Sequence, residues 1–442
     1  MAREHWKSSA GFVFAAVGSA VGLGNVWRFP TVVGRNGGGA FVLVYLLIIA
    51  VIGVPMLITE SVLGKRSQRG VGSAFKQIIR GTRWQFGGTL SLAASLVILS
   101  FYSVIAGWIL IYLVGSLSGG WVSGDVAQLE SQFARVSAHP VLPVLAQAVF
   151  IAITAAVVAG GVRRGIERAN LFIMPGIFVI SAVLLVRSVS LPGATEGIRW
   201  FLLPDASKLS LRVVLEALGQ VFFSFSLGMG AIVTYGSYLS RDENIPAGAA
   251  WIAAADLSVA LVAGFIVIPS LFAFGIEPGT GPGLIFVSLP AVFSTLPASA
   301  LWASLFFTML SLAAISSAVS MLEVWVSFLV EEKRFARSAA ALVGSAAVFL
   351  LGIPSALAQG VLSGFVIFGR NFLDLADYVS SNLLLPLSGL LTVLFVGWVW
   401  GARNAVREIE TNHRFRERRA WMFLIRYVVP LAIAYVLITG LL

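Results

Sequence analysis

Long runs of apolar residues, separated by short polar connections, recur along the whole chain. Each run is close to the roughly 20 residues that a helix needs to cross a bilayer, so the pattern predicts eleven membrane-spanning helices. The expected spans are residues 11–34, 39–62, 87–115, 142–161, 165–188, 210–240, 246–274, 297–330, 335–356, 376–400 and 421–442. The pattern therefore predicts an all-α polytopic membrane protein, with residues 1–442 forming a single transmembrane domain.

The first expected span contains residues that are unusual in a membrane helix. Its stretch GSAVGLGNVWRFP, Gly18 to Pro30, carries three glycines, an asparagine and an arginine. Glycines four residues apart, such as Gly18 and Gly22, also occur where two membrane helices pack closely, and the glycines alone favour that interpretation. A polar amide and a cation near mid-span, Asn25 and Arg28, are costly in lipid and favour a binding site. We therefore predict a discontinuous helix whose free backbone groups bind a ligand.

A second interruption is expected in the sixth span, because transporters built from inverted repeats break helices at corresponding positions in both halves. The stretch GQVFFSFSLGMGAIVTYGSY, residues 219–238, has serines and glycines at its centre. The spacing of the two breaks predicts five-helix repeats at 1–188 and 210–400, followed by an eleventh helix at 421–442. A broken helix exposes carbonyls that attract cations and amides that attract a carboxylate. Two facing breaks therefore suit a zwitterionic amino acid together with sodium.

Composition and charge support a membrane protein and indicate its orientation. The 442 residues are 58% hydrophobic and 11% charged, with a net charge of +10. The basic connections GKRSQRG, GGVRRGIER, EEKRFAR and RNAVREIETNHRFRERR fall on one side of the predicted topology. The positive-inside rule then places the amino end in the cytoplasm and the carboxyl end outside, in a plasma membrane that we expect to be a bacterial inner membrane. The basic excess reflects topology and contact with anionic lipid, and no nucleic-acid partner is expected.

Three further absences in the sequence narrow the class of protein. The amino end lacks the pattern of a cleaved signal peptide, so we expect the first apolar run to be a retained span. The chain has no cysteine, which excludes disulfides, thiol catalysis and thiolate metal sites. No nucleophile and base pairing, histidine cluster or metal motif indicates an enzyme.

Several motifs resemble the neurotransmitter:sodium symporter family, whose bacterial members include the leucine transporter. They are REHW, GSAVGLGNVWRFP, NGGGAF, GIERANLFIMP and FSFSLGMGAIVTYGSY. The resemblance covers essentially the whole chain except for a twelfth span, which this sequence lacks. It implies a 5+5 inverted repeat with discontinuous helices 1 and 6. It also implies sodium-coupled symport of amino acids by alternating access.

The resemblance implies two sodium sites made of oxygen ligands, which hard cations prefer. Sodium site 1 would comprise the backbone of Ala20 and the side chains of Asn25, Ser224 and Asp256. Sodium site 2 would comprise the carbonyls of Gly18, Val21 and Ala313 and the hydroxyls of Ser316 and Ser317. Serines in membrane helices commonly bond back to their own helix, and on their own the two serines favour that alternative. The first-span match favours the sodium role.

The same resemblance implies a substrate pocket. The amides near Gly22 and Gly24 and the Tyr102 hydroxyl would bind the carboxylate, and carbonyls of Ala20, Phe223 and Ser226 the amine. The full set is Ala20, Gly22, Gly24, Ile98, Tyr102, Phe223, Ser224, Ser226, Met229, Ser317 and Met321. Its apolar, charge-free side-chain compartment implies a neutral hydrophobic L-amino acid. Since methionine adapts its shape, Met229 and Met321 predict tolerance of substrates from aliphatic to aromatic. The alternative is that both methionines only fill gaps in the core.

Asp256 departs from many family members, which have asparagine at this position, while the animal members add a chloride ion nearby. Beside Tyr45, Gln220 and Ser224, a carboxylate would supply that negative charge itself, so we expect no chloride requirement. A buried carboxylate that loses its cations binds a proton more readily. This gives the hypothesis that Asp256 returns protonated and that protons are antiported. A structural carboxylate, hydrogen-bonded within the bundle, is the alternative.

The resemblance also implies two gates and a hinge. Arg28 and Asp377 would form the outer ion pair above Tyr102 and Phe223. The inner gate would comprise Arg3, Trp6, Ser237, Tyr238 and Glu331. Gly165 and Pro175 match a pattern that permits the fifth span to unwind, although Pro175 alone also fits an ordinary kink.

Two other classes remain open on the sequence alone. A proton-coupled amino-acid transporter with the same broken helices would not need paired hydroxyls in the eighth span. A channel or sensor would keep the binding site but lose the gates. The oligomeric state is not determined by the sequence.

Overall fold

The computed structural model describes residues 6, 9–81, 83–119, 125–240, 242–276 and 283–441. In these residues every named element is a helix, and pairing between strands is limited to two isolated bridges. The helices are α1 (Ser9–Ala20), η1 (Gly24–Arg28), α2 (Phe29–Arg35), α3 (Gly39–Ile48), η2 (Ile49–Gly53), α4 (Val54–Ser67), α5 (Val71–Ile78), α6 (Gln85–Leu117), α7 (Val126–Ala138), α8 (Leu142–Ala159), η3 (Val162–Glu167), α9 (Arg168–Val189), α10 (Ala194–Leu202), η4 (Ala206–Lys208), α11 (Leu211–Ser224), α12 (Ala231–Gly236), α13 (Ile245–Ala273), η5 (Leu284–Ser288), α14 (Leu289–Ser294), α15 (Ser299–Lys333), α16 (Arg337–Ala356), α17 (Phe372–Val379), η6 (Ser380–Leu384), α18 (Leu385–Leu394), η7 (Phe395–Val399), α19 (Ala402–Ile409), α20 (Arg418–Phe423), η8 (Leu424–Val428) and α21 (Val429–Leu441).

Nine continuous helices in the described part of the chain are long and apolar enough to cross a membrane. Several of these are composite, such as Gly39–Ser67, which joins α3, η2 and α4. The bent pair Gly11–Ala20 and Gly24–Arg35 makes a tenth span if it is counted once. The eleven predicted spans are compatible with this result when α11 and α12 are taken together as a broken sixth span.

Both predicted interruptions are present. The two halves of the first span meet at 46°. In the sixth span, α11 ends at Ser224 and α12 begins at Ala231. Between them Ser226, Gly228 and Gly230 have φ angles of 54°, 78° and 80°, in the left-handed region that cannot continue a right-handed helix. Glycine adopts this region without steric cost, so the two glycines explain where the sixth span breaks.

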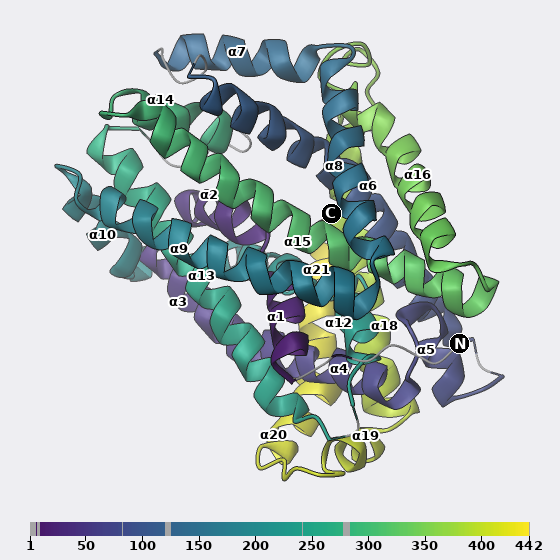
Figure 1. The fold of residues 1–442 in the computed structure, drawn as a ribbon. Coiled ribbons are helices and arrows are strands. Elements are labelled where there is room, and N and C mark those ends of the chain that lie inside the picture. The colour runs from purple at the N-terminus through teal and green to yellow at the C-terminus, as the bar shows by residue number, and fades with distance from the viewer. Residues whose placement is uncertain are drawn as a thin grey trace.

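The long helices α6 and α15 pack against each other at the centre of the bundle, and α8 and α16 pack against both. On another side of α15 lie α9 and α1, and α13 packs on both of those. Figure 1 shows α7 and α14 at one end of the bundle and α19 and α20 at the other. One buried apolar cluster extends through most of these helices, so the transmembrane part has a continuous core.

The backbones of α4 and α12 approach closely at two glycines. A β-carbon at Gly236 would lie 2.8 Å from the backbone oxygen of Ser61, and one at Gly64 would meet the Val233 carbonyl and lie 2.8 Å from the Ser237 nitrogen. Such small residues allow membrane helices to pack backbone to backbone. The shorter half of the broken sixth span is therefore held against α4.

Several short helices in the connections lie outside the predicted spans, including α5, α7, α10, α14 and α19. α7 begins at the side chain of Asp125, which accepts a 2.8 Å bond from the Gln128 backbone N–H as an N-cap. Its Phe133 ring stacks on Phe286 of η5, with ring centroids 4.9 Å apart. These helices are too short for a search based on runs of about 20 apolar residues.

Candidate functional site

Three side chains from three different spans meet beside the break in the first span. Asn25 Nδ2 donates to Asp256 Oδ1 at 2.7 Å and to Ser224 Oγ at 3.1 Å. The Ser224 hydroxyl donates to the two carboxylate oxygens of Asp256, at 2.8 and 2.9 Å. All three residues are buried. The structure therefore brings together the three side chains predicted for sodium site 1, and Ala20, the fourth member, is buried at the end of α1.

Two of the three neighbours expected from the chloride-site resemblance, Tyr45 and Ser224, lie beside the Asp256 carboxylate. The buried Tyr45 hydroxyl lies within electrostatic reach of Asp256. Gln220 is buried and its Nε2 donates to the Gly24 carbonyl at 2.8 Å. The Asn25 Oδ1 accepts a 3.1 Å bond from the Gly22 N–H, so the side chain closes the broken turn of the first span. A polar cluster thus fills the interior of the bundle at this point.

Three of the residues predicted for the second sodium site, Val21, Ala313 and Ser316, lie together between α15 and the break in the first span. The Ser316 hydroxyl donates to the Val21 carbonyl at 3.2 Å and to the Ala313 carbonyl at 3.0 Å. The bond to Ala313 is the back-bond to its own helix that was given as the alternative, and the bond to Val21 joins the serine to the first span; the sodium role stays a prediction. Ser317 instead donates to the Ser19 carbonyl at 3.1 Å. Gly18, on α1, lies one turn before Val21 and packs against Asn170 of α9.

A serine network that the sequence did not indicate lies next to this site. Ser19 Oγ donates to Ser320 Oγ at 2.8 Å, and Ser226 Oγ donates to the Ser19 carbonyl at 2.9 Å. Glu60 of α4 was missed as well, although it is buried and accepts a 2.8 Å bond from the Gly228 N–H. Its signal in the sequence is a carboxylate within an apolar span.

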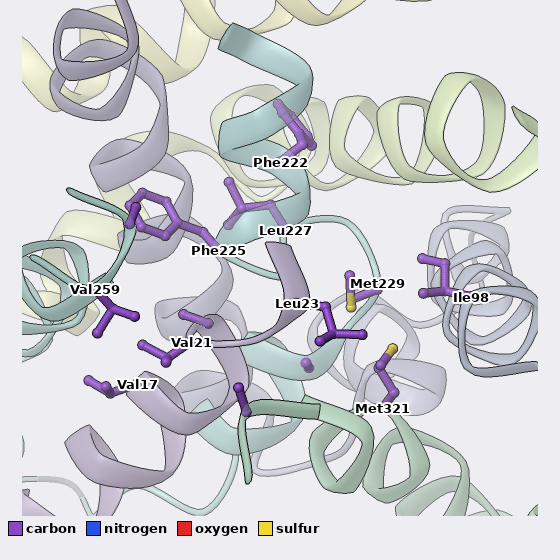
Figure 2. Packing of buried hydrophobic residues seen from close by; sticks show 14 of the residues in the cluster. Val17, Val21, Leu23, Ile98, Phe222, Phe225, Leu227, Met229, Val259 and Met321 are labelled. Carbon is purple, nitrogen blue, oxygen red and sulfur yellow. The ribbon is translucent and has the colours of Figure 1, made fainter. Parts of the chain in front are cut away.

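A small cavity of about 20 Å³ lies between the two breaks. It is lined by Ser19, Ala20, Gly22, Leu23, Gly24, Ile98, Tyr102, Phe223, Ser226, Met229, Ser317 and Met321. Ten of the eleven predicted substrate residues line it, and Ser224, the exception, lies in the Asp256 cluster. Figure 2 shows Leu23, Ile98, Met229 and Met321 around the same space.

The polar end of this cavity differs in detail from the prediction. The Gly22 N–H donates to Asn25, whereas the Leu23 N–H points toward the Tyr102 hydroxyl at 3.5 Å. Leu23 was not predicted to take part. The end of the cavity near Tyr102 therefore combines a backbone amide with a hydroxyl, two groups that can donate to a carboxylate.

At the predicted outer gate, the Arg28 guanidinium lies over the Phe223 ring, 4.7 Å from its centroid. Asp377 is exposed and accepts a 3.0 Å bond from Ser381. Among the described residues no ion pair joins Arg28 to Asp377. Phe223 therefore lies between the cavity, which it lines, and the arginine.

At the predicted inner gate, Arg3 lies outside the described residues. The Trp6 indole donates to the Tyr235 carbonyl at 3.1 Å and packs edge-on against the Tyr238 ring. The Ser237 hydroxyl donates to the Thr234 carbonyl, and Glu331 accepts a 3.0 Å bond from the Gly70 N–H.

A buried ion pair that the sequence did not predict continues from these aromatic residues. The Tyr238 hydroxyl donates to Glu323 at 2.6 Å, and Glu323 pairs with Arg337 at 2.5 Å. The Glu323 side chain is 0% exposed. Burying a carboxylate requires such a partner.

The predicted hinge of the fifth span has a distorted backbone. Gly165 lies in η3, a π-helical segment, and a β-carbon there would meet the Val157 carbonyl. Gly161, just before η3, has a φ of 87°. Pro175 lies inside α9. Irregular turns of this kind commonly mark functional positions in helices.

Two broken helices whose ends meet at a polar cluster in the core of a helical bundle are the arrangement of a secondary membrane transporter. The model of the sodium:neurotransmitter symporter family matches residues 3–138 and 123–442, so the chain belongs to this family.

Two similar sequences and one similar structure support this assignment. The sodium-dependent transporter YhdH of Bacillus subtilis (strain 168) is 40% identical over 433 residues, covering 98% of this chain and 96% of that protein. A sodium-dependent transporter of Haemophilus influenzae is 35% identical, covering 99% and 98%. The crystal structure of MhsT in complex with L-phenylalanine has a TM-score of 0.93 and 41% identity, covering 99% of this chain and all of that one. The predictions of an all-helical transporter fold and of a protein that is not an enzyme are confirmed.

Proposed function

We propose that this protein takes up neutral hydrophobic L-amino acids, from aliphatic to aromatic, together with two sodium ions and without chloride. Residues 1–188 and 210–400 would be the two repeats that alternate access to the cavity, with 421–442 as an added helix. The proposal is carried by one observation: a charge-free cavity lies between two clusters of buried oxygen atoms.

The composition of the cavity supports the substrate class. Ile98, Met229 and Met321 supply an apolar wall, and no lining residue carries a charge that would pair with a charged side chain. A similar protein, MhsT, has been solved with L-phenylalanine. Because about 20 Å³ is too small for an amino acid, side chains of the wall must move to admit one, and unbranched methionines do so at low cost.

The geometry at Asn25 supports a cation in the first cluster. Its amide NH₂ group donates to the Asp256 carboxylate and therefore occupies a position where positive charge is favoured. A sodium ion would replace the NH₂ group, and the amide would rotate to present Oδ1 instead. Asp256 then supplies the negative charge that a chloride ion would otherwise provide. We retain the hypothesis that Asp256 binds a proton on the return step and so couples transport to proton antiport.

The topology and gates follow from the same proposal. The amino end lies in the cytoplasm and the carboxyl end outside, because the basic connections flank one face. Opening of the outer side separates Arg28 from Asp377, which form an ion pair only when that side closes. Arg3 and Glu331 form the inner pair together with Trp6, Ser237 and Tyr238, and unwinding between Gly165 and Pro175 admits water to the second sodium site.

Uptake into proteoliposomes tests the proposal directly. Labelled tryptophan and leucine are supplied under an inward sodium gradient, with chloride replaced by gluconate. Accumulation that requires sodium but not chloride supports the proposal. Accumulation driven by a proton gradient without sodium overturns it, and binding without accumulation indicates a sensor. In the same vesicles, Asp256→Asn should abolish any proton countertransport and introduce a chloride requirement.

A further inference from the structure

A groove of about 610 Å³ lies where three helix ends meet, away from the substrate cavity. Its lining comes from α5, from the loop before α6, from the start of α6 and from the end of α15. The residues are Gly72, Lys76, Arg83, Gln85, Phe86, Thr89, Phe328 and Glu332. The volume falls within the range of about 300–1,000 Å³ that is typical of sites for small ligands. The groove is therefore large enough for a compact polar group.

The charges of the groove favour an anion. Lys76 and Arg83 are exposed, and no ion pair is recorded for either of them within the part of the chain that the structure describes. Glu332 is the acidic residue of the lining, and one of its oxygens accepts a 2.7 Å bond from Ser73. The lining therefore carries two positive charges and one negative charge, and this net positive charge favours an anion.

The position and apolar surface of the groove place it at the boundary between membrane and water. α6 begins at Gln85 and α15 ends at Lys333, and both are membrane-spanning helices. Phe86, in the first turn of α6, is 58% exposed beside the two cations. A soluble anion would gain nothing from an exposed phenylalanine, whereas a lipid would place its headgroup against the cations and its chain against the ring.

We propose that this groove binds the headgroup of an anionic phospholipid, with the phosphate between Lys76 and Arg83 and an acyl chain along Phe86. The site lies on the face that the positive-inside rule assigns to the cytoplasm, where anionic lipids attract basic residues.

α5, which lines the groove, also contacts the broken sixth span. The Val71 N–H, at the start of α5, points to Thr234 Oγ1 of α12 at 3.4 Å, and the Val71 side chain abuts Gly230 at the break. Gly70 and Ser73 are bonded to Glu331 and Glu332 at the end of α15. A lipid that holds α5 against α15 therefore favours one position of α12, so the lipid also sets the rate of transport. This second part rests on the proposed function, whereas lipid binding does not.

Native mass spectrometry of the full chain in detergent measures binding separately from transport. Phosphatidylglycerol is titrated into wild type, into Lys76→Gln/Arg83→Gln and into Arg403→Gln/Arg416→Gln. The last variant is the control, because it removes the same charge from exposed positions outside the groove. At about 1 kcal/mol for each basic residue near a membrane surface, the groove variant should bind phosphatidylglycerol about 30-fold more weakly. The control should remain within about twofold of wild type.

Three results would overturn the site: equal weakening in both variants, equal binding of phosphatidylcholine and phosphatidylglycerol by wild type, or displacement of phosphatidylglycerol by inorganic phosphate. Lys76→Arg/Arg83→Lys, which keeps both charges, should bind as wild type does and excludes misfolding as the cause of any loss. In proteoliposomes, phosphatidylglycerol should change the initial uptake rate of wild type and of the control, but not of the groove variant. Retained lipid binding with equal uptake in all vesicles would refute only the connection through α5.

Discussion

Ser316→Ala tests the second sodium site with the smallest structural change. The Ser316 hydroxyl lies 3.2 Å from the Val21 carbonyl and 3.0 Å from the Ala313 carbonyl, so three oxygens from α15 and from the break in the first span are close together. With a cation among them, the hydroxyl turns its proton away and presents a lone pair. A polar contact to a charged group contributes about 1.5–3 kcal/mol. Its loss should raise the sodium concentration for half-maximal uptake by about 10- to 150-fold.

The assay is initial uptake of labelled amino acid into proteoliposomes at increasing external sodium. Ser320→Ala is the matched control, because Ser320 lies one turn further along α15, is also buried and bonds to Ser317 and Ser19. It should change the sodium dependence by less than about threefold, because neither of its neutral hydrogen bonds involves the Val21, Ala313 or Ser316 oxygens. An equal sodium dependence for wild type and Ser316→Ala would refute the reasoning and leave this serine with a purely structural role.

Other substitutions test other parts of the structure. Met321→Ile stiffens the cavity wall, so tryptophan should compete with leucine uptake about tenfold less well, and unchanged competition would show that this methionine only fills the core. Arg337→Leu leaves the buried Glu323 carboxylate unpaired and should lower the free energy of unfolding in detergent by about 3–5 kcal/mol. Arg66→Leu removes an ion pair whose arginine is 57% exposed and should lower the free energy of unfolding by less than about 1 kcal/mol. Equal losses in Arg337→Leu and Arg66→Leu would show that burial of the ion pair does not determine its contribution to stability.

The sequence predicted the membrane spans because their signal is local. A run of about 20 apolar residues is sufficient evidence for a span, and glycines with polar residues inside such a run are sufficient evidence for a break. The short helices α7 and α10 were not predicted, because they lie in the connections between spans and do not need a long apolar run to cross the hydrocarbon. Their stability comes from contacts with distant segments, such as Phe133 on Phe286, which no local pattern reveals.

The candidate site was predicted as a set of residues but not as a set of bonds. The residues of the cavity were found because family motifs fix their order along the chain. Asn25 accepts a hydrogen bond from the Gly22 N–H, which leaves the Leu23 N–H to face Tyr102. This arrangement depends on how the broken turn closes, and the sequence alone does not show it. Glu323 and Arg337 are 14 residues apart in two different helices, so their pairing depends on how α15 and α16 pack.

The close approach of α4 and α12 couples the positions of these two helices. The backbones are too close at Gly64 and Gly236 for one helix to slide past the other. The Glu60 carboxylate of α4 also accepts a hydrogen bond from the Gly228 N–H, in the loop before α12. If α4 and α12 move together, a displacement of the loop between α11 and α12 would also move Arg66, which lies near the end of α4 and pairs with Glu408 of α19. A probe attached near Arg66 should therefore report movement of that loop at the protein surface.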